Sequence, residues 1–69
     1  MDFSEALLQA KAGAFVSRES WPDTIKVGAQ FPDAGSANTK PYLYMIKGDD
    51  RFPLDLSCES IFAEDWKIV

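Results

Sequence analysis

A chain of 69 residues with one cysteine and no histidine must build its core without a cross-link. A disulfide within the chain needs a second cysteine, and Cys58 among scattered carboxylates does not make a zinc site. A domain of about 60 residues buries only about 60% of the surface that its unfolded chain exposes. Chains of this size gain stability from oligomerisation when cross-links are absent, so we expect a single domain over residues 1–69 that forms a homo-oligomer.

Composition narrows the classes of function. Hydrophobic residues make up 46% of the chain and aromatic residues 13%, which is typical of a globular protein. The net charge of −4 argues against binding to long DNA or RNA, although a small phosphorylated ligand needs only one or two cations. We find no signal peptide, membrane-spanning run or lipidation motif, and therefore expect the protein to stay in the cytosol that makes it. Cys58 is then a reduced thiol, expected to pack as a small hydrophobe near the core.

The segment "DFSEALLQAKAG" predicts a helix with both ends marked. Asp2 is the expected N-cap, and Glu5 stands where a capping box places it. Gly13 is able to take the left-handed conformation that follows many helices. One apolar face at helical spacing is made by Phe3, Ala6, Leu7 and Ala10.

The rest of the chain predicts a small antiparallel sheet. Strands are expected over 14–20, 24–31, 42–46, 51–54 and 66–69, with a loop over 32–41. Gly48 suits a tight hairpin turn, and Pro53 should lie at a sheet edge or strand end because it has no N–H to donate. Ser57 is the expected N-cap of a short helix. The fold class is α+β, with an N-terminal helix packed on the sheet, a short C-terminal helix and a terminal strand.

The last strand carries one of the two tryptophans. Trp66 and Ile68 are expected on one face, where they would add apolar area to a small core. The sequence leaves open whether this strand joins its own sheet or packs on another subunit.

No catalytic constellation is visible, so we do not expect an enzyme. Schemes that pair a serine or cysteine with a histidine are excluded by the lack of histidine. The carboxylate pairs 49–50 and 64–65 lie near predicted turns, where solvated charge is expected. The glycines do not have the spacing of a phosphate-binding loop.

Four residues near predicted strand ends are candidates for ligand binding, and they comprise one arginine and three aromatic residues. Arg18 and Trp21 are suited to phosphate and a nucleobase, respectively. The plainer interpretation makes Trp21 a core or interface anchor and Arg18 a surface ion-pair partner. Tyr42 and Tyr44 share one face of a strand and would serve as an interface or a stacking platform if that face is exposed.

The stretch "DFSEALLQAKAGAFVSRESW" resembles the opening of the phage Thoeris anti-defence family, second type. That family has a Phe-x-Glu-Ala-Leu run, then Lys-x-Gly, Val-x-Arg and a Trp three residues on. Further along, "PYLYM" resembles its Pro-Tyr-[Ile/Leu]-x-Met strand, and "FAEDWKIV" resembles its close. The chain departs from the pattern at Ser20, Leu54 and Leu56, which leaves the identity of the ligand in doubt more than the fold.

The resemblance implies a protein that binds a nucleotide second messenger of bacterial immunity and holds it without cleaving it. The ligand would be a glycocyclic ADP-ribose or a cyclic dinucleotide, with no cofactor. It further implies a homo-oligomer, commonly a tetramer, with pockets between subunits. The alternative is a structural or protein-interaction module of a phage or prophage with no nucleotide ligand, and a small hydrolase is a distant third.

The resemblance also assigns expected roles to the ligand-binding candidates. A base would stack on Trp21, Tyr42 or Tyr44. Arg18 and Arg51 would neutralise a pyrophosphate. Ribose hydroxyls would be bound by Asn38, Thr39 or Asp49.

Overall fold

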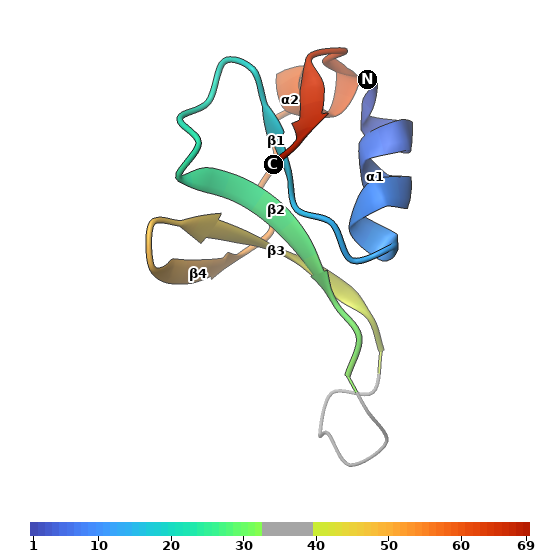
Figure 1. Cartoon of the computed structure of the whole chain (residues 1–69), viewed down its shortest axis with the longest axis vertical. Coiled ribbons are helices and arrows are strands. Elements are labelled where there is room, and N and C mark those ends of the chain that lie inside the picture. Colours follow the sequence, from blue (N-terminus) through green and yellow to red (C-terminus); the bar gives the residue numbers. More distant parts are fainter. Residues whose placement is uncertain (33–39) are drawn as a thin grey trace.

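The computed structural model describes residues 1–32 and 40–69. A five-stranded antiparallel sheet has the strand order β4-β3-β2-β1-β5 (Figure 1). Its elements, in chain order, are α1 (Phe3–Lys11), β1 (Val16–Arg18), β2 (Ile25–Gln30), β3 (Tyr42–Lys47), β4 (Asp50–Pro53), α2 (Cys58–Phe62) and β5 (Trp66–Ile68). The predicted α+β class, with its N-terminal helix, short C-terminal helix and terminal strand, is confirmed.

Both ends of α1 are set by the residues that the sequence marked. The Asp2 carboxylate accepts a hydrogen bond from the Glu5 N–H at 2.9 Å, so one half of the expected capping box forms. At the other end Gly13 has a φ of 102°, and its N–H bonds the Ala10 carbonyl oxygen at 3.0 Å. The next N–H, of Ala14, bonds the Gln9 oxygen at 3.0 Å, which completes a Schellman motif.

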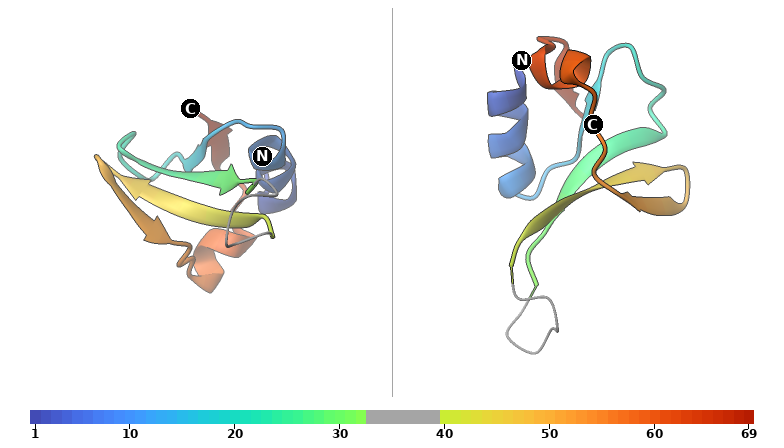
Figure 2. Two further views of the ribbon diagram at one scale, coloured as in Figure 1. Left: turned by 90° about the horizontal axis from the view of Figure 1, so that it is seen from below. Right: turned by 180° about the vertical axis from the view of Figure 1, so that it is seen from behind.

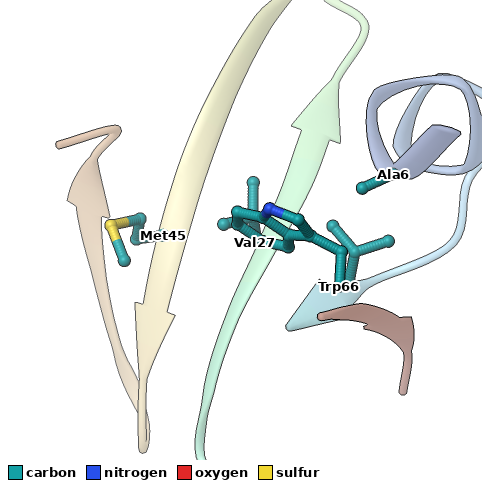
Figure 3. Packing of buried hydrophobic residues seen from close by; sticks show 5 residues of the cluster. Ala6, Val27, Met45 and Trp66 are labelled. Carbon is teal, nitrogen blue, oxygen red and sulfur yellow. The ribbon is translucent and has the colours of Figure 1, made fainter. Parts of the chain in front are cut away.

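Both helices lie against one face of the sheet (Figure 2), and the core fills the space between them. Val16 of β1, Val27 of β2 and Met45 of β3 are successive cross-strand partners, so their side chains share that face. Ala6 of α1 is fully buried above them. Figure 3 shows Ala6 and Val27 to either side of Trp66, with Met45 on the next strand.

Trp66 is the largest side chain of this core and is only 2% exposed. Its strand, β5, pairs with β1 of the same chain, with Arg18 opposite Trp66. The indole Nε1–H donates to the Ser60 carbonyl oxygen of α2 at 2.9 Å, and the backbone N–H donates to the Met1 oxygen at 3.0 Å. Trp66 therefore joins the sheet, α2 and the start of the chain. Ile68 shares its face but is 53% exposed, since β5 is the outermost strand.

The expected burial of Cys58 is wrong. Its thiol is exposed, because Cys58 begins α2 and the buried residue of that short helix is Ser60. The Ser57 hydroxyl caps the helix by accepting from the Ser60 N–H at 3.2 Å, as its sequence position predicted. Within the described residues, no helix is long and apolar enough to cross a membrane.

The edge hairpin of β3 and β4 also follows the sequence signals. Gly48 has a φ of 62° in the turn between the two strands, a conformation that glycine adopts without strain. Pro53 is the last residue of β4, which is an edge strand. An edge strand end is a place where a residue without an N–H does not interrupt the ladder.

Candidate ligand-binding site

The face of the sheet opposite the helices carries three of the predicted ligand-binding residues. Side chains alternate along a strand, so Tyr42 and Tyr44 point away from the face that holds Met45. Arg51 is the cross-strand partner of Ile46, which shares the face of the two tyrosines. We call this face the outer face. No helix of the described part of the chain covers it.

A hollow of about 390 Å³ lies at the sheet edge where β4 ends, and outer-face residues form part of its walls. The pairing of β3 with β4 stops at Tyr44 and Pro53, whereas β3 begins two residues earlier at Tyr42. Those first residues of β3 have no β4 partner, and the gap beside them is the hollow. Its walls are Tyr42, Leu43, Tyr44, Arg51, Phe52, Pro53 and Leu54.

The two tyrosines of the hollow differ in exposure. Tyr42 is 46% exposed, whereas Tyr44 is 8% exposed. Their ring centroids are 6.5 Å apart with an interplanar angle of 60°. The Arg51 guanidinium lies over the Tyr44 ring, with its Cζ 5.0 Å from the centroid, a cation–π contact. The hollow thus combines an open aromatic ring with a guanidinium, which suits a base next to a phosphate.

Within residues 1–32 and 40–69, no ion pair involves Arg51. A guanidinium without a carboxylate partner keeps its forked donors for an anionic ligand. Leu54, one of the departures from the family pattern, lies in the wall of this same hollow. A change of ligand preference is therefore expected there more than in the core.

Sequence reasoning did not assign Gly28 and Phe15 to the surroundings of this site. Gly28 is the cross-strand partner of Tyr44, and a Cβ at this position would lie 2.6 Å from Phe15 Cε1 and 3.1 Å from Tyr44 Oη. The Phe15 ring and the Tyr44 hydroxyl therefore both lie against the bare backbone of Gly28. A glycine inside an alternating strand was the available signal, because it marks a close approach of another group.

Arg18 lies on the helix side of the sheet, away from the hollow. Its Nε donates to Asp65 Oδ1 at 2.8 Å and its Nη2 to Asp65 Oδ2 at 3.3 Å, while Nη1 donates to Ser60 Oγ at 3.2 Å. The hydrogen bond from Arg18 holds the pKa of Asp65 below its ordinary value of 3.8, and the same bond raises the pKa of Arg18. Asp65 was expected to be a solvated charge, and that expectation is wrong.

Trp21 is also placed on the helix side. Its ring meets that of Trp66 edge-to-face at 5.3 Å, with an interplanar angle of 78°. The Arg18 Cζ lies 6.0 Å from the Trp21 ring centroid. The structure brings Trp21 and Arg18 together with Trp66, and it does not bring them to Tyr42 and Arg51. Their proposed contact with a ligand stays a prediction.

The other candidates do not join the hollow in the described residues. Asp49 lies in the exposed turn after β3, at the opposite end of that strand from Tyr42. Asn38 and Thr39 lie outside the described residues. Among the residues that are described, no three histidine, cysteine or acidic side chains are grouped to hold a metal ion.

These features define a small α+β domain with a hollow suited to an aromatic, anionic ligand. The sequence model of the Tad2-like family, the Thoeris anti-defense 2-like domain, matches residues 1–69. The chain therefore belongs to the Thoeris anti-defense 2-like family over its whole length, as its motifs predicted. Comparison with curated proteins gives no match.

Proposed function

We propose that this protein binds a cyclic nucleotide second messenger of bacterial immunity, a glycocyclic ADP-ribose or a cyclic dinucleotide, and sequesters it without cleaving it. Membership of the Thoeris anti-defense 2-like family supports the class of function. The observation that carries the chemistry is the hollow beside the end of β4, whose walls include both the exposed Tyr42 ring and Arg51. The site of action is the host cytoplasm, where such a messenger is made.

The hollow supplies part of the affinity that sequestration needs. Nanomolar binding corresponds to about −12 kcal/mol. A base stacked on Tyr42 would contribute about 1–3 kcal/mol. Charge-assisted hydrogen bonds from Arg51 to a phosphate are about twice as strong as neutral ones. The remainder must come from burying the ligand, and a hollow open to solvent on one chain does not bury it.

A homo-oligomer provides that burial. Among residues 1–32 and 40–69, eight large apolar residues are exposed on the single chain: Leu8, Phe31, Tyr42, Phe52, Ile61, Phe62, Ile68 and Val69. Exposed apolar area on this scale in so short a chain favours association. We propose a tetramer whose pockets lie between subunits, so that a second copy closes the hollow of the first. Loss of the oligomer would then abolish ligand binding.

Native mass spectrometry tests the proposal. The protein is sprayed alone and with a pool of glycocyclic ADP-riboses and cyclic di- and trinucleotides. We expect an oligomer that retains one compound at fixed stoichiometry, and the compound recovered after denaturation should have its original mass. A hydrolysed or otherwise altered compound would contradict sequestration.

Two variants locate the site. Arg51→Gln removes the guanidinium, and Tyr42→Leu removes the ring. Each should reduce retention at least tenfold, the effect of a lost interaction of about 1.4 kcal/mol. Lys47→Gln is the matched control, because Lys47 lies over Phe52 at 5.4 Å in the same hairpin and is absent from the walls of the hollow. Equal losses in all three variants would contradict the hollow as the site.

One observation supports the alternative, a structural or protein-interaction module with no nucleotide ligand. Phe62 of α2 is 83% exposed, more than any other large apolar side chain described, and it lies away from the hollow. An oligomer that retains no compound from the pool, and that dissociates when Phe62 is replaced by serine, would favour this alternative.

A further inference from the structure

Tyr44 lines the hollow, but its ring is closed to a ligand. It is 8% exposed, and the Arg51 guanidinium lies over the ring 5.0 Å from its centroid. A base stacks on an aromatic face that solvent can reach, and Tyr44 offers none. Tyr42, at 46% exposure, offers one.

We infer that the two tyrosines have different roles. Tyr42 stacks the base, and Tyr44 is a positioning residue that holds Arg51 in place for the phosphate. This inference rests on the proposed function, since it assigns roles within the same hollow. It also assigns Phe15 and Gly28 a part in the site, although neither lines the hollow.

Close contacts on the outer face lie on both sides of Gly28, the cross-strand partner of Tyr44. The Lys26 Nζ lies 5.5 Å from the Phe15 ring centroid. Phe15 and the hydroxyl of Tyr44 both approach the backbone of Gly28 so closely that a Cβ there would collide with Phe15. Tyr44 then supports Arg51 on its ring. The rings are thereby fixed by packing rather than by the ligand.

A fixed guanidinium binds anions better than a mobile one. An arginine side chain loses rotamer freedom when it becomes ordered, and this loss opposes binding. Because Tyr44 holds Arg51 in the free protein, most of this rotamer freedom is already lost before a ligand binds. Replacement of the ring by an aliphatic side chain should therefore weaken binding of an anion about three- to tenfold.

The same geometry favours one class of ligand. The Tyr42 ring centroid lies 6.5 Å and the Arg51 Cζ 5.0 Å from the centroid of the Tyr44 ring. A ligand that carries both an aromatic base and a phosphate is therefore able to reach both residues, as a nucleotide does.

The test uses three variants and a readout that needs no ligand. The heteronuclear NOE of the Arg51 side-chain Nε–Hε group, measured by NMR on the free protein, reports how rigidly the guanidinium is held. We expect Tyr44→Phe to keep the native value, because the ring is retained. Tyr44→Leu should lower it, and Tyr42→Leu should leave it unchanged.

Titration with inorganic pyrophosphate, followed on the same Nε–Hε signal, gives the second readout. We expect Tyr44→Leu to weaken pyrophosphate binding three- to tenfold and Tyr44→Phe and Tyr42→Leu to leave it near the native level. Where Tyr44→Leu does not fold, Phe15→Leu provides a second test, since the Phe15 ring and the Tyr44 hydroxyl approach the same backbone at Gly28.

Two results would overturn the inference. One is an Arg51 signal that stays rigid in Tyr44→Leu or Phe15→Leu. The other is a loss in Tyr44→Phe as large as in Tyr44→Leu, which would make the hydroxyl a direct ligand contact. A protein that retains no nucleotide but shows the expected changes at Arg51 would refute the proposed function and leave the positioning role of Tyr44 standing.

Discussion

The two faces of the sheet use arginine in opposite ways. On the helix side, Arg18 is 11% exposed at its side chain and gives its donors to Asp65 and Ser60. On the outer face, Arg51 is exposed and rests on Tyr44, with no ion pair in the described part of the chain. The first guanidinium ties β1 to the residue before β5, whereas the second is the one that we propose to bind a ligand.

Residue type and strand position alone do not distinguish an arginine that pairs within the fold from one that is available to a ligand. Arg18 sits at a strand end beside Trp21, just as a ligand-binding arginine would. What decides its role is Asp65, which the sheet brings to it from the far end of the chain. Variants at four residues test this contrast between the two faces of the sheet.

Trp66→Ala should have the largest effect. Loss of a buried tryptophan costs about 3–5 kcal/mol, and the core of a chain this small rarely supplies more than about 3–5 kcal/mol. The free energy of unfolding should therefore fall close to zero, and far-UV circular dichroism at room temperature should show a substantial unfolded fraction. Tyr42→Ala is the control on the outer face and should remain folded. A cooperative thermal transition near the native midpoint in Trp66→Ala would contradict the central place of Trp66.

Asp65→Asn should have the next largest effect, and one that depends on pH. The pKa of Asp65 is lowered in the folded protein by the hydrogen bond from Arg18. Its contribution to stability is therefore fully present above the unfolded pKa of about 3.9 and is lost as the pH falls through the folded value. Urea denaturation should show Asp65→Asn less stable at pH 7, with the gap narrowing below about pH 4.

Asp23→Asn is the matched control for this pair. Asp23 contacts Lys67 at 3.3 Å, but its side chain is 83% exposed. A surface ion pair of this kind contributes little, so Asp23→Asn should match the native protein at both pH values. A gap between Asp65→Asn and the native protein that is constant with pH would show that the carboxylate charge is not what stabilises the pair.

Gly28→Ala should have an intermediate effect, of about 1–3 kcal/mol, because the new methyl group overpacks the outer face. The cost is steric, since Gly28 has no positive φ and the collision is with the Phe15 ring. Thermal unfolding of Gly28→Ala and of Gly28→Ala with Phe15→Leu measures it. The double variant should regain part of the stability that Gly28→Ala loses. If Phe15→Leu instead lowers stability in the Gly28→Ala background as much as it does in the native protein, the contact between Phe15 and the new methyl group would be contradicted.

Arg51→Gln should have the smallest effect on stability, within about 0.5 kcal/mol, since it is a surface substitution at a residue that has no ion-pair partner among the described residues. The same variant is expected to lose ligand binding. Chemical denaturation and native mass spectrometry on one preparation separate the two properties. Arg18→Gln should show the reverse pattern, with a clear loss of stability.

Local signals predicted most of the fold. Asp2, Gly13, Gly48 and Ser57 each act through neighbours within a few residues, so their roles are readable from spacing. The alternation of β2 and β3 likewise predicted which side chains share a face. The family was also predicted from its motifs and is confirmed.

The candidate site was predicted only in part because it depends on where strands end in space. Tyr42, Tyr44 and Arg51 do meet, although the hollow between them exists because β4 stops at Pro53 before reaching the start of β3. The sequence marked Pro53 as a strand end without showing what the end would uncover. Gly28 was similarly visible, but the rings that lie on it come from β3 and from the residue before β1.

The pairing of β5 with β1 bears on how quickly the chain folds. The hairpins β2–β3 and β3–β4 join neighbours in sequence and can form early, whereas Trp66 meets Arg18 only after a long loop closes. Contacts of such large sequence separation slow folding. Until that loop closes, α1 packs on a sheet that lacks Trp66. We therefore expect the formation of the β1–β5 ladder to be the rate-limiting step in building the core.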